Sequence, residues 1–202
     1  MLFTLVLASL FEIFVPSYMF FADWKLAKDK SGIQIYTKNI EEVGFKQIKA
    51  TVKLESSVES CVALIKDANA GKDWINRVVE FKDLKIENDS LWYTYAEIDI
   101  PWPFNNKDLV SKNKLVVDQK SGAVTIFLES MPDFIPEADG KKRIKKSEGS
   151  WKFIPQEDGT TEVIYQIFAE PNDFLPQWLV NMVVIGSIFD TFQEFREKVK
   201  AY

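Results

Sequence analysis

The residues that carry most enzyme chemistry are scarce in this sequence. Its 202 residues contain no histidine, which removes the commonest general base and every Ser-His or Cys-His arrangement. Cys61 is the only cysteine, so no internal disulfide and no thiolate zinc cluster can form. GxGxxG, P-loop and GxSxG patterns are absent as well. We therefore expect no metal, no cofactor and no enzymatic activity.

Aromatic side chains are what the composition does offer. The chain has 16 Phe, 6 Trp and 6 Tyr, which can build a large core and equally suit a cavity that holds an apolar ligand. The net charge of −5 at pH 7 argues against nucleic acid as a partner, because nucleic-acid binding needs a basic face.

One corner of the sequence places an aromatic side chain on a rigid turn. Apolar residues lead into Pro101-Trp102-Pro103-Phe104, and the apolar pattern resumes after Asp108. The prolines cannot continue a central strand, because each lacks a backbone donor and has a fixed φ. Trp102 is therefore either packed into a core or held out for a ligand, while Asp108 is better suited to fixing a loop than to chemistry.

The pattern of apolar residues predicts one α+β domain over residues 23–202. Successive strands joined by short turns imply an antiparallel sheet. In chain order we expect a short amphipathic helix over 23–32, strands over 33–40 and 45–54, a helix capped by Ser57, six strands between 77 and 171, and a long helix over 176–200.

The first half of the last predicted helix is apolar around nearly its whole circumference. The stretch LPQWLVNMVVIGSIF, residues 175–189, has only Gln177, Asn181 and Ser187 as polar breaks. A helix of this kind must be covered on all sides. From Asp190 the pattern becomes amphipathic, which fits a helix that lies over a sheet-lined cavity.

Residues 1–22 form an apolar stretch with three interpretations. The length and the Ala22-Asp23 junction fit a cleaved secretory signal, although Glu12 interrupts the apolar run and no Lys or Arg precedes it. A membrane anchor and a helix packed on the domain are the alternatives. We predict a signal peptide and hence export to the periplasm or envelope; without a signal, the protein would be cytoplasmic.

Four segments occur together in order: DWKLAKDKSGIQIYTK, IPWPFNNKDLV, GSWKFIP and LPQWLVNMV. They resemble bacterial START-domain proteins, the lipid-transfer modules related to steroidogenic acute regulatory protein, over residues 23–200. The resemblance implies a helix-grip fold, in which a curved antiparallel sheet wraps around a long C-terminal helix with an internal cavity for a lipid or sterol. One departure is Lys107, since the family usually has Arg before the Asp and Lys cannot form the planar bidentate pair of Arg.

The resemblance implies a lipid-binding surface on the inner side of the sheet and of the last helix. Alternation leaves open whether Phe127 or its neighbours Ile126 and Leu128 face that side. The residues that we predict to bind lipid are Trp92, Thr94, Ile98, Trp102, Phe104, Phe127, Met131, Phe134, Trp151, Phe153, Ile167, Trp178, Met182, Ile185 and Phe189.

The segment 131–143 is longer than a hairpin needs, and its position resembles that of the loop that gates the family's cavity. Its apolar tip over residues 131–135 precedes Lys141, Lys142 and Arg143, a combination that suits transient contact with an anionic membrane. The alternative is a solvated loop whose phenylalanine folds back on the helix.

Two other functions stay open beside lipid binding. Related helix-grip proteins include cyclases and hydratases for polyketide-like substrates, which here would need Tyr95, Glu97, Asp99 or Glu129 to face the cavity. A module that binds a protein or a membrane without a ligand is the other alternative, and a collapsed cavity would favour it. Our leading hypothesis is a monomer that binds, and can transfer, a lipid or another hydrophobic small molecule.

Overall fold

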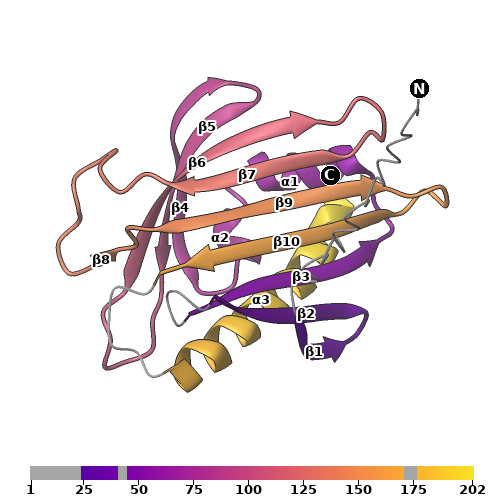
Figure 1. Cartoon of the computed structure of the whole chain (residues 1–202). Coiled ribbons are helices and arrows are strands. Elements are labelled where there is room, and N and C mark those ends of the chain that lie inside the picture. Colours follow the sequence, from indigo (N-terminus) through magenta and orange to yellow (C-terminus); the bar gives the residue numbers. More distant parts are fainter. Residues whose placement is uncertain (1–23, 41–44, 171–176) are drawn as a thin grey trace, which may run out of the picture.

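The computed structural model describes residues 24–40, 45–170 and 177–202, without the side chains of residues 40, 45, 46 and 177–182. Within these ranges the chain forms a large curved sheet, and the long helix α3 (Gln177–Lys198) crosses one of its faces (Figure 1). The predicted α+β architecture, an antiparallel sheet wrapped around a long C-terminal helix, is confirmed. The predicted signal peptide over residues 1–22 lies outside the described residues and stays a prediction.

Ten strands of the described chain belong to one sheet, whose order departs from the order of the sequence. The sheet runs β1-β2-β3-β10-β9-β7-β6-β5-β4, and β8 pairs in parallel with β6 beside this path. The pairs along the path are antiparallel. The strands are β1 (Lys25–Lys30), β2 (Ile33–Ile40), β3 (Phe45–Leu54), β4 (Val78–Asn88), β5 (Leu91–Ile98), β6 (Lys107–Val117), β7 (Val124–Ser130), β8 (Lys142–Arg143), β9 (Ser147–Pro155) and β10 (Thr161–Ala169).

The prediction of a helix over residues 23–32 is wrong, because this segment forms strand β1 of a hairpin with β2. Ser31 and Gly32 have positive φ angles of 54° and 73°, which a two-residue type I′ turn requires at both positions. Lys30 pairs directly with Ile33 across this turn. Sheet pairing thus overrides the helix preference of the Lys, Leu and Ala residues in the segment.

Two short helices, α1 (Val58–Lys66) and α2 (Gly71–Trp74), precede strand β4. The predicted N-cap is confirmed, since the backbone N–H of Ser60 donates to the Ser57 hydroxyl at 3.1 Å. Cys61 is fully buried in α1, and this burial raises the pKa of its thiol to about 12. The only cysteine therefore acts as a small apolar side chain. Among the described residues, no helix has the length and apolar character needed to cross a membrane.

An aromatic cluster, defined here as Trp74, Trp151, Phe153, Phe192 and Phe195, fixes the C-terminal half of α3 to the sheet. The Trp151 ring stacks on Phe192 and Phe195 with centroid separations of 5.5 and 5.6 Å. Trp74 of α2 meets the Phe195 ring edge-on at 5.1 Å. Burial of each such side chain contributes about 1.5–3 kcal/mol, so the cluster anchors this half of the helix firmly.

The preceding part of α3 is held less tightly. The side chains of 183–187 are all half-buried, whereas Phe192 and Phe195 have no exposed surface. One hydrogen bond connects this part to the turn between α2 and β4, since the Ser187 hydroxyl donates to the carbonyl oxygen of Asn76 at 3.2 Å. The N–H of Asn76 donates to the hydroxyl of Thr191, next to Phe192, at 3.0 Å. Residues 183–187 are thus less tightly packed than the part of the helix that carries Phe192 and Phe195.

Gly149 marks a place where strands β9 and β10 approach too closely for a side chain. A Cβ there would lie 2.6 Å from the carbonyl oxygen of Gln166 and 2.8 Å from Cδ1 of Ile167.

We expect Gly149→Ala to lower the free energy of unfolding by about 1–3 kcal/mol, because the backbone of β10 must move. Gly186→Ala is the matched control, since a Cβ there has nothing within 4 Å and should stabilise α3 by up to about 1 kcal/mol. Urea denaturation gives the free energy of unfolding of both variants. Equal midpoints would show that β9 and β10 can accommodate a side chain at position 149.

Candidate functional site

A cavity of about 360 Å³ lies between the sheet and helices α2 and α3. Its walls come from β4, β5, β6, β7, β9 and β10, and α3 covers it. The volume falls within the range of about 300–1,000 Å³ typical of small-molecule sites. Because most of the lining side chains are apolar, the space suits a ligand that is mainly hydrocarbon.

The strands supply the lining from alternate positions. Along β5 and just beyond it, Trp92, Thr94, Ala96, Ile98 and Ile100 belong to the lining, which is the face that alternation predicts. Of the residues predicted to bind lipid, those in the lining are Trp92, Thr94, Ile98, Trp151 and Ile167. Their contact with a bound lipid stays a prediction.

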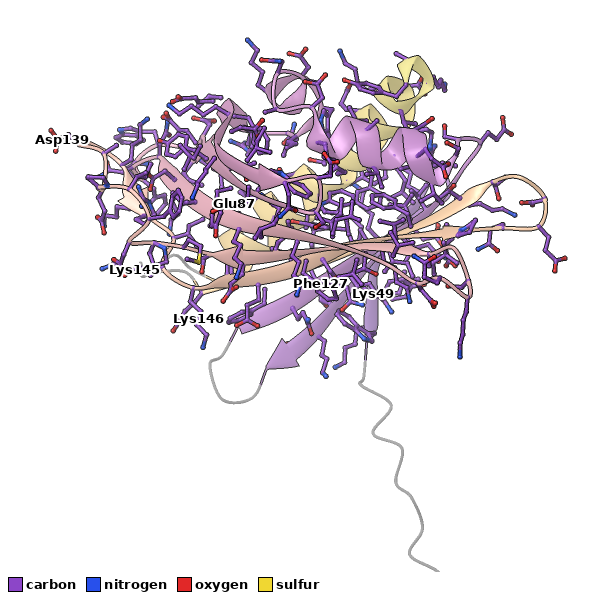
Figure 2. All side chains as sticks on the ribbon, turned by 90° about the horizontal axis from the view of Figure 1, so that it is seen from above. Lys49, Glu87, Phe127, Asp139, Lys145 and Lys146 are labelled. Carbon is purple, nitrogen blue, oxygen red and sulfur yellow. The ribbon has the colours of Figure 1, made fainter. Side chains whose placement is uncertain are left out.

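The structure corrects the placement of Phe127. Its ring is 50% exposed on the face of β7 that points away from the helices (Figure 2). The inward positions belong to Ile126, which has no exposed surface, and to Leu128, which lines the cavity. Alternation allowed both registers, and only the pairing with β6 and β9 decides between them.

Three further predicted residues lie outside the lining: Phe153 and Phe189 are buried, and Ile185 is half-buried. Phe153 packs in the aromatic cluster behind Trp151. Phe189 is 3% exposed and lies under the ammonium group of Lys28, which is 3.6 Å from its ring centroid. Ile185 packs against the core. The side chains of Trp178 and Met182 lie outside the described residues.

Four predicted residues belong to loops outside the lining. Trp102 is 92% exposed in the loop between β5 and β6, where its peptide bond to Pro103 is cis. Phe104 of the same loop and Met131 of the next loop are half-buried. Phe134 is 37% exposed and stacks on Tyr93 at 4.4 Å, on the outer face of β5. Their apolar character, taken from sequence, did not indicate which side of the sheet they occupy.

The cavity also contains polar residues that sequence reasoning missed. Asn113 is buried in the lining, and its amide donates to the Thr94 hydroxyl at 3.1 Å and to the Trp92 carbonyl oxygen at 3.3 Å. Ser111 lies on the same face of β6. A polar side chain at an inward position of a buried strand was the available signal, because it interrupts the apolar face.

One end of the cavity is aromatic. Trp74, Trp92, Trp151 and Tyr165 line it there. Tyr165 stacks on Trp151 at 4.3 Å, and burial raises the pKa of its phenol well above the usual value, so the hydroxyl keeps its proton at neutral pH. In the part of the chain that the structure describes, the Trp74 indole N–H is the buried side-chain donor that lacks a hydrogen-bond partner.

The other end, which we call the charged end, carries Arg77, Lys107 and Glu170. Val78 pairs with Ile98 and Ile98 pairs with Lys107, so Arg77 and Lys107 lie at the same end of strands β4 and β6. Lys107 is 7% exposed, which is unusual for lysine.

Arg77 is held in an uncommon backbone conformation at this charged end. Its φ of 64° is in the left-handed region, which costs a non-glycine residue roughly 1 kcal/mol. Its Nη1 donates to Oδ2 of Asp99 at 3.0 Å, and the N–H of Asp99 donates to the Arg77 carbonyl oxygen at 2.8 Å. Since the preceding Asn76 is bonded to α3, this turn connects α3 to the start of the β5–β6 loop.

A buried ion pair closes the loop over residues 131–143. Nε and Nη2 of Arg143 donate to the two carboxylate oxygens of Asp108 at 2.9 Å each, and both side chains are almost fully buried. Asp108 thus fixes a loop, and Arg143 supplies the bidentate pair that Lys107 cannot. The same guanidinium also donates to the carbonyl oxygens of Pro132, Ile135 and Pro136. This loop is pinned, and its tip does not line the cavity.

The four acid or base candidates lie outside the cavity lining. Tyr95, Glu97 and Glu129 occupy the outer face of the sheet, and Asp99 pairs with Arg77. Lys141 pairs with Glu97, and this hydrogen bond holds the pKa of the Glu97 carboxyl below its usual range. A cavity acid would need a raised carboxyl pKa instead.

Comparison with known proteins gives concordant results, although no family model matches the chain. An uncharacterized protein of Pseudomonas aeruginosa is 35% identical over 176 residues, which are 86% of this chain and 85% of that protein. The phosphatidylcholine transfer protein of Rattus norvegicus is 29% identical over 165 residues, 79% of this chain and 76% of the relative. A STAR-related lipid transfer protein from Xanthomonas axonopodis superimposes with a TM-score of 0.81 at 33% identity, over 88% of this chain and 98% of that one.

The curved sheet, the cavity beneath it and the helix that covers the cavity define a helix-grip protein. With the similarity to the Xanthomonas axonopodis structure, they assign the family as well. The chain belongs to the StAR-related lipid transfer (START) family.

Arg143→Met tests the buried ion pair. Removing one partner leaves the Asp108 carboxylate buried without its counter-charge, so we expect the free energy of unfolding to fall by about 3–5 kcal/mol. Lys53→Met is the matched control, because the Lys53–Asp158 pair has both side chains 56% exposed and should contribute at most about 1 kcal/mol. Urea denaturation at neutral pH compares the two, and similar losses would mean that the Arg143 pair has no special role.

Proposed function

We propose that this protein binds a lipid, or another largely apolar small molecule, in its cavity and transfers it between membranes. The observation that carries the proposal is a mostly apolar cavity of about 360 Å³ between the sheet and α3. Relatives named phosphatidylcholine transfer protein and STAR-related lipid transfer protein support a lipid ligand.

The energetics favour a ligand with a long apolar part. Each buried methylene contributes about 0.8 kcal/mol, while association costs an estimated 4–15 kcal/mol in lost motion. A chain of about twelve methylenes therefore gains about 10 kcal/mol, enough to offset a mid-range cost, and a short fragment does not. The polar groups of the lining then contribute more to the orientation of such a ligand than to its affinity.

Uptake and release need an opening, and we propose the β5–β6 loop together with the first half of α3. Residues 183–187 of this half are less tightly packed than the part of α3 around Phe192, and the loop over residues 99–106 borders the charged end of the cavity. Loop opening of this kind commonly sets the rate of ligand exchange.

We propose that the loop also touches the membrane, through Trp102. The indole is 92% exposed and is flanked by Pro101 and Pro103. Indole side chains favour the membrane–water interface, where one part of the ring is apolar and its N–H is hydrated.

The proposal includes no catalytic step. The candidates for an acid or base, Tyr95, Glu97, Asp99 and Glu129, lie outside the lining, so a cyclase on polyketide-like substrates has weaker support. Tyr165 and Glu170 do reach the cavity but were not among those candidates.

Ala96→Phe tests whether the cavity is the lipid site. The added ring fills the space beside Phe81 and Leu109, so we expect lipid retention to fall at least tenfold in protein that stays folded. Native mass spectrometry of protein purified from its own host measures retention, and solvent extraction identifies the lipid. Thr125→Phe adds the same ring on the outer face, beside Phe127, and should retain lipid normally. Normal retention by Ala96→Phe would place the ligand elsewhere.

Trp102→Ala tests membrane contact separately from binding. We expect the rate of transfer of a fluorescent phosphatidylcholine between vesicles to fall several-fold, with equilibrium loading unchanged, because Trp102 lies outside the cavity lining. Phe127→Ala removes a different exposed aromatic ring and serves as control. Unchanged transfer rates in both variants would show that Trp102 does not contribute to membrane contact.

A further inference from the structure

Arg77 is a cavity residue with unused hydrogen-bonding capacity. Nη1 donates to Asp99, but Nε and Nη2 have no hydrogen-bond partner among the described residues. Its side chain is 33% exposed and belongs to the cavity lining. A guanidinium presents five N–H donors in a planar fork that matches carboxylate and phosphate oxygens. The unused side of this fork is therefore suited to an anionic oxygen group.

The partner that Arg77 does have is a replaceable one. Asp99 is 51% exposed, begins the β5–β6 loop, and contacts the guanidinium through Nη1 alone. The buried pair of Arg143 with Asp108 is different, since both nitrogens of one edge engage both carboxylate oxygens. An anion that arrives from the cavity could bind Arg77 through two nitrogens and displace the exposed aspartate.

The surroundings of Arg77 favour an anion over a cation. Lys107 is the other cation of the charged end, with only β5 between its strand and β4. Glu170, the carboxylate of the lining, lies at the same charged end, so with Asp99 displaced the lining there keeps two cations, Arg77 and Lys107, beside one carboxylate. Ile98 and Ile100 are the nearest apolar lining residues on β5 and beyond it, so the anion would be partly shielded from water.

The position of Arg77 also has a mechanical consequence. Asn76 is bonded to Ser187 and Thr191 of α3, and Arg77 is bonded to Asp99 at the start of the loop. The left-handed backbone of Arg77 holds its side chain at this junction. Releasing Asp99 would remove one connection between α3 and the loop that we propose to open.

We propose that the cavity ligand is an anionic or zwitterionic lipid whose carboxylate or phosphate binds Arg77 in place of Asp99, with its hydrocarbon part directed toward the aromatic end of the cavity. This inference rests on the proposed function, because it assumes that the cavity holds a lipid. It adds the chemical class of the lipid and the residue that recognises its charged group.

The test compares three ligands of equal chain length: laurate, dodecylphosphocholine and dodecanol. Each displaces the neutral fluorescent probe N-phenylnaphthylamine from the cavity, below the micelle concentration. Wild-type protein should bind at least one of the two charged ligands about tenfold more tightly than dodecanol, since hydrogen bonds to charged groups are the stronger class. A preference for laurate alone assigns a carboxylate, and a preference for dodecylphosphocholine alone assigns a phosphodiester.

Two variants with opposite expected effects make the test specific. Arg77→Asn keeps a residue that tolerates positive φ and removes the charge, so the preference over dodecanol should disappear while dodecanol binding stays. Asp99→Asn leaves Arg77 in place and removes its competitor, so the affinity for the preferred charged ligand should rise several-fold. Arg196→Gln removes a guanidinium that bonds Ser31 far from the cavity and should change neither affinity.

The outcomes separate this inference from the proposed function. If wild-type protein binds none of the three ligands, the proposed function fails. If dodecanol binds as tightly as the charged ligands, or if the preference survives in Arg77→Asn, lipid binding stands and the role of Arg77 is refuted. Should Arg77→Asn not fold, an unchanged or lowered affinity in Asp99→Asn would by itself overturn the inference.

Discussion

The packing of Trp151 against Phe192 and Phe195 is the interaction on which the rest of this structure depends. A strongly curved sheet leaves a concave space that must be filled by side chains or covered by a helix. The aromatic cluster fills that space at one end, where α3 is firmly attached. Beyond the cluster the same helix covers a cavity. The cavity therefore exists because the aromatic side chains stop half-way along the sheet.

The two ends of the cavity follow from the sequence of the strands that build it. The inward positions of β5 are Trp92, Thr94, Ala96 and Ile98, so the largest side chain of this strand lies at the aromatic end and smaller ones follow it. Charged residues are found where β4 and β6 begin and β10 has ended, next to loops that solvent can reach. Placing charge there avoids the desolvation that a charge among the aromatic rings would suffer. A ligand with one apolar and one polar end matches this gradient.

Most of the fold could be predicted from sequence, because alternating strands and an all-round apolar helix have few stable arrangements. The prediction of a helix over residues 23–32 was wrong, since its Lys-rich pattern fits a strand on the sheet edge equally well.

The site was harder to predict. Alternation gave the face of Trp92 and Ile98, but not the register of Phe127 or the depth of Phe153. Asn113 and Arg77 were missed, because their roles depend on partners far apart in the chain, including Thr94 and Asp99.

The two loops at the charged end differ in a way that bears on gating. Residues 131–143 looked like the mobile element in sequence, being long and apolar at the tip. The structure gives that loop a buried guanidinium that bonds three of its own carbonyl oxygens as well as Asp108, and such a centre is costly to break. The β5–β6 loop is held by the Arg77–Asp99 pair, which is partly exposed and weakened by solvent, and by hydrogen bonds of Asn106 to Glu97, Ile100 and Lys142. The loop that carries Trp102 therefore has a partly exposed ion pair where the other loop has a buried one, and this difference is the reason for proposing it as the opening.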